Sequence, residues 1–183
     1  MNIIISDKGK EFLRQLDFNI SENIDIILAE VPQAELLGLS FIKILESEEE
    51  KKESPIDTVA AYFQSSNNKQ AFIEIYLNKY FSKKYSKEIL KLILPLKLFE
   101  LAQIIYHEIG IHFAKTKTHN IKQKKCEEFA VTYSKRIIAQ YLSKNKNKLT
   151  QTLDLLEKYS KNSGLKNESV VQMKQLFKEV LNI

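Results

Sequence analysis

A long apolar stretch in the second half of the chain carries two of its three histidines, and the third follows shortly after. All three lie between residues 107 and 119, and two belong to the run His107-Glu108-Ile109-Gly110-Ile111-His112. Residues 96–115 around this run contain no proline and have the apolar spacing of a helix. Histidine and glutamate bind metals and transfer protons, so the geometry of one helix constrains both the fold and the chemistry.

The spacing of the two histidines leaves two geometries open. On a regular α-helix, residues i and i+4 lie about 40° apart around the axis, whereas residues i and i+5 lie about 140° apart. His107 and His112 would then face different directions, and Ile111 would share the face of His107. A one-residue π-bulge, a feature frequent at functional sites, would return His112 to that face, and Gly110 would ease the distortion.

The rest of the chain predicts an α+β fold in which strands precede helices. Capping residues and apolar spacing predict a short helix over residues 6–16. Stretches rich in isoleucine, leucine and valine predict strands, and helical spacing dominates after residue 85. The expected strands cover residues 24–31, 39–45, 58–64 and 71–77, the last two as a hairpin, and the later helices cover residues 86–94, 96–115, 124–142, 149–159 and 168–181. Residues 46–54 are highly charged and predict an exposed linker.

Length and composition predict one domain with a substantial core. The chain has 183 residues, of which 44% are hydrophobic, and we expect residues 1–183 to form a single domain. Residues 145–183 form either a helical appendage or part of the same core. No basic, apolar leader and no apolar run of roughly 18–20 residues is present, which predicts a cytoplasmic protein without a membrane partner. The single cysteine, Cys126, agrees with a reducing compartment.

The basic charge of the chain does not by itself indicate a nucleic-acid partner. The net charge is +5, but Arg14 and Arg136 are the only arginines, and arginine reads phosphates and bases better than lysine. No groove-reading motif or glycine-rich phosphate loop accompanies the lysines. We therefore expect no specific nucleic-acid binding. The lysines of residues 115–125 follow the histidine run and could steer an acidic substrate towards it.

Two stretches resemble the gluzincin class of zinc metallopeptidases. Small members of that class carry Leu-x-His-Glu-Ile-Gly-His-His on the active-site helix, and the next helix carries a glutamate ligand in a Glu-Glu-x-Ala-like context. The corresponding stretches here are Tyr106-His107-Glu108-Ile109-Gly110-Ile111-His112 and Cys126-Glu127-Glu128-Phe129-Ala130. The resemblance covers roughly residues 24–142. It implies a small zincin-like domain with a sheet of three or four strands packed on an active-site helix and a glutamate helix, followed by C-terminal helices.

The same resemblance implies a peptidase site that departs from the pattern at Ile111, where the class has its second zinc histidine. Enzymes of the dipeptidyl peptidase III type are similar in carrying His-Glu-x-x-x-His on a bulged helix, with a Glu-Glu pair whose second member binds zinc. By that resemblance the zinc ligands here are His107, His112 and Glu128, and Glu108 is the general base that activates water for attack on a peptide bond. The substrate would be a peptide or protein that adds to the strand of residues 72–77 at the sheet edge.

Several alternatives remain open in the sequence. Glu127 competes with Glu128 for the ligand role, because spacing alone does not separate them, and His119 is a substitute third ligand if it is not a solvated loop residue. Tyr133 is either a core residue or a donor to a reacting oxyanion. On a straight helix, Ile111 would extend an apolar stripe instead. The chain would then be a catalytically degenerate zincin-like scaffold acting as a binding or regulatory module.

Overall fold

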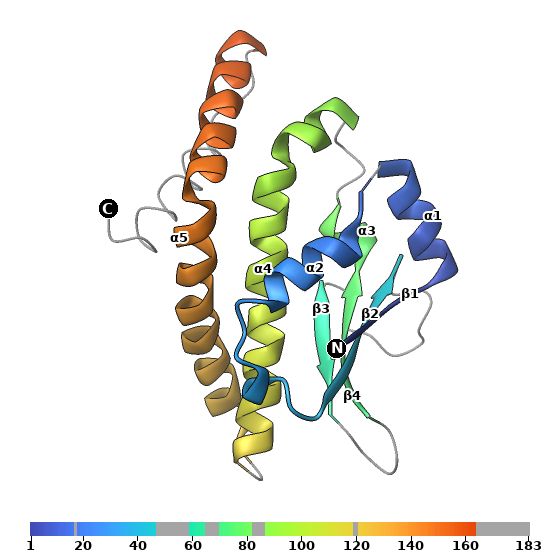
Figure 1. Cartoon of the computed structure of the whole chain (residues 1–183), viewed down its shortest axis with the longest axis vertical. Coiled ribbons are helices and arrows are strands. Elements are labelled where there is room, and N and C mark those ends of the chain that lie inside the picture. Colours follow the sequence, from blue (N-terminus) through green and yellow to red (C-terminus); the bar gives the residue numbers. More distant parts are fainter. Residues whose placement is uncertain (17, 47–58, 65–69, 82–86, 119–120, 164–183) are drawn as a thin grey trace.

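The fold is an α+β arrangement, as predicted, with helices covering one face of a four-stranded sheet (Figure 1). The computed structural model describes residues 1–16, 18–46, 59–64, 70–81, 87–118 and 121–163. The elements in chain order are β1 (Asn2–Ile5), α1 (Asp7–Leu16), α2 (Ile20–Leu28), the 3-10 turn η1 (Gln33–Glu35), β2 (Leu39–Leu45), β3 (Ala60–Phe63), β4 (Ala71–Tyr76), α3 (Leu77–Tyr80), α4 (Lys87–Lys117) and α5 (Gln123–Ser163). Among these residues, no helix is both long and apolar enough to cross a membrane.

The sheet has the order β1-β2-β4-β3 and is parallel except for β3, which pairs antiparallel with β4. Alternate residues of the two inner strands point towards the helices, and these side chains are fully buried. They are Ile42, Ile44, Ile73 and Ile75. α2 and α4 lie over this face, and α5 packs along the outer side of α4 (Figure 1). The core therefore joins the sheet to the helix that carries the histidine run.

The predicted strand at residues 24–31 is wrong, because residues 24–28 form the second half of α2 and residues 29–31 the turn after it. Ile24, Ile27, Leu28 and Val31 are buried at the i, i+3, i+4, i+7 spacing of a helix. The Asn19 side chain caps the helix by accepting a hydrogen bond from the backbone N–H of residue 22 at 3.3 Å. The density of isoleucines in this segment favoured a strand.

The prediction that residues 72–77 form the sheet edge is also wrong. The strand exists, as β4 of the predicted hairpin, but it lies between β2 and β3. The edges of the sheet among the described residues are β3 on one side and β1 on the other. Any segment that extends this sheet must therefore pair with β3 or with β1.

The helical half of the chain is more continuous than predicted. Residues 87–117 form one helix with Pro95 inside it, whereas the sequence left open whether Pro95 begins a second helix or kinks a continuous one. Residues 149–159 are not a separate helix but continue α5. Leu149 and Leu153 are buried in the main core, so the beginning of the expected appendage belongs to that core. The predicted helix at residues 168–181 and most of the predicted linker, 47–54, lie outside the described residues.

Candidate functional site

The histidine run lies on a regular α-helix. Residues 107–112 are α-helical throughout, so the π-bulge that the sequence left open is not present. As helix geometry requires for residues five apart, the two histidines meet different neighbours. His107 faces α5, whereas His112 contacts β3 and the turn before β2.

His107 pairs with Glu127 across the interface of α4 and α5. Its Nε2 lies 3.1 Å from Oε2 of Glu127, and the other carboxylate oxygen accepts a 2.6 Å hydrogen bond from the side-chain amide of Gln123. The histidine side chain is 29% exposed and that of the glutamate 43%. Gln123 lies one helical turn before Glu127 and orients its carboxylate. The His107–Glu127 pair is therefore a partly exposed contact between the two helices.

The structure resolves the choice within the glutamate pair in favour of Glu127 as the neighbour of His107. Glu128 is exposed, and the contact it makes is a hydrogen bond from the Thr132 hydroxyl to its backbone carbonyl. The predicted ligands His107, His112 and Glu128 are thus not brought together. His119, the alternative third ligand, lies outside the described residues.

His112 is buried, and both of its ring nitrogens have protein partners. Nε2 lies 2.9 Å from the carbonyl oxygen of Leu37, and Nδ1 lies 3.2 Å from the hydroxyl of Tyr62 on β3. Burial lowers the pKa of the imidazole. In the neutral form, Nε2–H donates to the carbonyl and Nδ1 accepts from the tyrosine, which satisfies every polar atom of the ring. His112 therefore ties α4 to two distant segments.

Glu108 is buried beneath β3 with an unusual protonation equilibrium. The residue is 8% exposed, and burial raises the pKa of its carboxyl group to about 8, with a further rise from the charge of Glu127. The backbone N–H of Tyr62, which donates to this carboxyl group, and the charge of Lys115 offset part of the rise. At neutral pH the side chain is mostly protonated, a state suited to exchanging a proton with a bound group.

The hydrogen bond to Glu108 uses the outer edge of β3. The backbone carbonyl of Val59 accepts a hydrogen bond from the N–H of Tyr76. In an antiparallel pair the direction alternates, so the backbone N–H and C=O groups of Ala61 and Phe63 also point to β4. Tyr62 belongs to the other set and points its N–H away from the sheet, towards Glu108. The carboxyl group thus occupies one of the positions that a peptide strand would use at this edge.

Ile111 fills the place that a second ligand on the face of His107 would need. It lies one turn after His107 and is buried in a small cluster with Ala114, Cys126 and Ala130. The Cys126 thiol lies 3.8 Å from the backbone carbonyl of Ile111, and the cysteine is fully buried, as expected for an inert thiol. Between α4 and α5, the His107–Glu127 pair is therefore followed directly by an apolar cluster and not by a further ligand.

Gly110 is explained by helix packing and not by a bulge. A Cβ atom at this position would lie 2.8 Å from the backbone Cα of Ala130 and 3.1 Å from the Tyr133 ring. The glycine therefore allows α4 and α5 to approach closely beside the histidine run. Tyr133 is buried, and its hydroxyl donates a 2.7 Å hydrogen bond to Glu35, so it is a core residue engaged with η1.

Among the residues that the structure describes, the predicted ligands do not assemble into a three-ligand zinc site. Zinc in a peptidase takes three protein ligands and leaves one position for water. His107 and Glu127 fit two of these positions, but Ile111 offers no donor atom, and His112 is turned away with both nitrogens engaged. Within the described residues, no group of three or more histidine, cysteine, aspartate or glutamate side chains has the geometry to hold a metal ion.

Sequence reasoning missed Tyr62 and Leu37 as neighbours of the site. Both reach His112 through contacts between residues 50 and 75 positions apart, for which no local pattern exists. The pairing of Gln123 with Glu127, in contrast, follows an i, i+4 spacing that is visible in the sequence. Comparisons of this chain with family models, with characterised proteins and with solved structures find no match.

Proposed function

We propose that this chain is a zincin-like protein that acts by binding, as a degenerate member of that class without peptidase chemistry. The observation that carries the proposal is the arrangement of the histidine run on a straight helix. His107 contacts Glu127 on one side of the helix. On another side, both ring nitrogens of His112 are hydrogen-bonded, to Tyr62 and to Leu37. What remains of a metal centre is two ligands next to Ile111, held in a rigid helical pair.

A zinc-dependent peptidase is the second candidate, and Glu108 is the observation that favours it. A buried carboxyl group whose pKa is raised to about 8 has the properties of a general acid or base. Its position beneath β3 also resembles the place where an extended peptide would be cleaved. This candidate requires a third zinc ligand beside His107 and Glu127, which the described residues do not provide.

Zinc binding to the wild-type chain and to the variant Ile111→His distinguishes the two functions. We expect the wild-type protein to retain little zinc after incubation with zinc salt and gel filtration. A histidine introduced at position 111 lies one turn from His107 on the same face and beside Glu127, so the variant should retain about one zinc per chain. Atomic emission of the protein peak measures the metal directly.

Two further variants assign the ligands. In the Ile111→His background, the additional change His107→Ala should remove the zinc again, although the introduced histidine is still present. The additional change His112→Gln should leave zinc bound, because His112 does not face the introduced side chain. If instead the wild-type protein holds one zinc that His112→Gln removes, then His112 is a ligand and the peptidase function replaces the binding function.

A further inference from the structure

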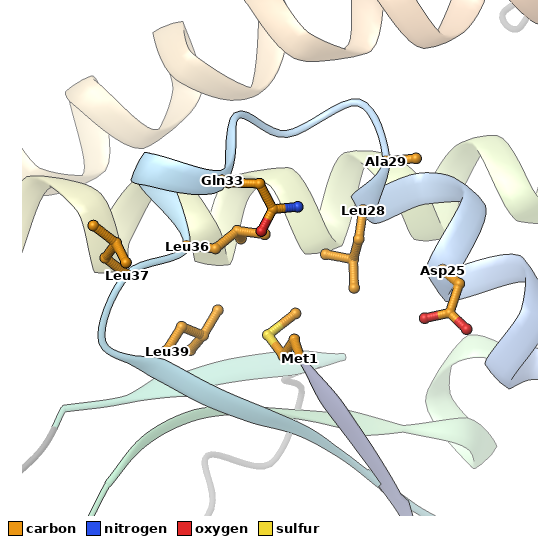
Figure 2. A pocket seen from close by; sticks show the side chains of 8 residues that line it. All are labelled: Met1, Asp25, Leu28, Ala29, Gln33, Leu36, Leu37 and Leu39. Atoms are coloured by element: carbon orange, nitrogen blue, oxygen red, sulfur yellow. The ribbon is translucent and has the colours of Figure 1, made fainter.

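An elongated cavity lies at the β1 edge of the sheet, on the side covered by α2. Its volume is about 390 Å³, and its walls come from Met1 just before β1, from α2, from η1 and the turn after it, and from the start of β2. In Figure 2 the side chains of Met1, Leu28, Leu36 and Leu39 point towards one another across the space, with Leu37 at one end and Asp25 at the other. The cavity therefore has four leucines and a methionine in its lining, together with polar groups that include the Asp25 carboxylate.

Two of the large apolar side chains that line the cavity are well exposed. Met1 is 43% exposed and Leu37 is 72% exposed. These two exposed apolar side chains line the same cavity, and neighbouring exposed apolar residues mark interaction surfaces more often than single ones do.

The backbone of β1 offers unpaired groups next to this cavity. Parallel strands bond through alternate residues, and the N–H of Ser6 donates to Ile44 of β2 at 2.9 Å. The N–H and C=O groups of Ile3 and Ile5 therefore point away from β2, and among the described residues none is hydrogen-bonded to them. Residues 1–6 contain no charged side chain and no proline, the residues that commonly protect an edge strand from pairing.

Charge selects the kind of partner for this edge. Residues 15–42 contain five acidic residues and no lysine or arginine, in a chain whose net charge is +5. Two of these acids are neutralised, since Glu30 pairs with Lys144 and Glu35 pairs with Arg136. Asp25 at the rim of the cavity has no basic partner among the described residues. The side chains that line the cavity are apolar, polar or acidic, and none of them is basic.

A second copy of the chain fits this edge poorly. Two β1 strands pairing about a twofold axis would place their two α2 helices on the same side of a continuous sheet. Each copy would then bring the same acidic stretch, residues 15–42, to that side of the sheet, and like charges across an interface oppose association. A basic segment from another protein meets the Asp25 carboxylate with the opposite sign.

We propose, building on the binding role inferred above, that β1 and the adjacent cavity bind an extended segment of a partner protein as an added strand. In such a segment, residues two positions apart face the same side of the sheet. One apolar side chain would enter the cavity between Leu28, Leu36 and Leu39. A lysine or arginine two positions away would reach Asp25. The residue between them would lie beside Ile4 on the other face.

The test uses short blocked peptides and the isotope-labelled full chain in the presence of a metal chelator. The probes are acetyl-Thr-Leu-Val-Lys-Thr-amide and the same residues in reverse order, because the strand direction is open. We expect a dissociation constant on the order of 0.1–1 mM for such short peptides. NMR shift changes should concentrate at the amides of Ile3 and Ile5, whose N–H groups gain hydrogen bonds. Peptides with alanine for leucine, or glutamate for lysine, should bind at least about tenfold more weakly.

Variants of the protein separate the contacts. Asp25→Lys should abolish binding, whereas Asp154→Lys, the same charge change on the exposed side of α5, should not. Ile3→Pro removes an N–H group that points to the open edge and should also abolish binding. Circular dichroism shows whether the Ile3→Pro variant folds. If that variant does not fold, the result for Asp25→Lys decides whether the segment binds at β1.

Three results would overturn the binding of a basic segment at β1. They are shift changes confined to Ala60 and Tyr62 on β3, self-association of the chain that Ile3→Pro abolishes, and no shift changes at millimolar peptide. None of them depends on zinc, because the chelator is present throughout. Failure of the peptide experiment therefore leaves the zinc experiment informative, and failure of the zinc experiment leaves the peptide result standing.

Discussion

The buried Glu108 should make the chain less stable as the pH rises, and Glu108→Gln should remove this effect. The pKa of its carboxyl group is raised from 4.5 to about 8 in the folded state. The folded protein therefore holds the proton more tightly than the unfolded chain does. Below pH 4.5 the group is protonated in both states. As the pH rises from 4.5 to 8, only the unfolded chain loses the proton, and folding becomes progressively less favourable.

The size of the effect follows from the interval between the two pKa values. At about 1.4 kcal/mol for each pH unit, the full loss approaches about 5 kcal/mol above pH 8, and it amounts to about 3 kcal/mol at pH 7. Glutamine has nearly the same shape, carries no charge, and retains an oxygen that accepts from the Tyr62 N–H. We therefore expect the stability advantage of Glu108→Gln over the wild type to grow by about 4 kcal/mol between pH 5 and pH 9.

Urea unfolding followed by circular dichroism at five pH values measures this difference directly. Groups that titrate equally in both proteins cancel in the comparison. Glu128→Gln is the matched control, because it makes the same chemical change on an exposed side chain of the neighbouring helix. Parallel pH curves for the wild type and Glu108→Gln would refute the reasoning, since they would mean that Glu108 ionises alike in the folded and unfolded chain.

Two further substitutions test the packing around the site. Gly110→Ala places a methyl group 2.8 Å from the Ala130 backbone, so α5 must shift; we expect a loss of about 1–3 kcal/mol, seen as a fall of roughly 3–10 °C in the melting temperature, and an unchanged melting temperature would contradict the close contact. Tyr133→Phe removes the hydrogen bond to Glu35, which keeps its ion pair with Arg136, and we expect a loss of about 1–2 kcal/mol in urea unfolding, whereas a neutral effect would show that this bond adds nothing to stability.

Local patterns predicted the elements whose signal lies within one segment. The strand at residues 39–45 has the predicted bounds, and the predicted hairpin forms as β3 and β4. β1 was missed, since its four residues become a strand only by pairing with β2, some 39 positions later in the chain. Such a long-range pairing leaves no mark in the spacing of nearby residues.

The site could be predicted only as a pair of alternatives. From helix geometry, the sequence correctly predicted that, without a bulge, His107 and His112 would face different directions and Ile111 would lie on the face of His107. Whether the bulge forms depends on packing against α5. There Gly110 is required for close approach to Ala130, which a local pattern does not reveal. The choice of Glu127 over Glu128 likewise follows from the rotation of α5 about its axis.

The buried ring of His112 gives the molecule a route for communication between the two edges of its sheet. It holds the carbonyl of Leu37, beside the cavity near β1, and the hydroxyl of Tyr62 on β3. A segment that displaced the Leu37 turn would break the Nε2 contact and change the hydrogen bonding available to Tyr62. Any coupling between the two edges through this ring would be limited to one or two hydrogen bonds, roughly 1–3 kcal/mol, or about a 5- to 150-fold change in affinity at the opposite edge.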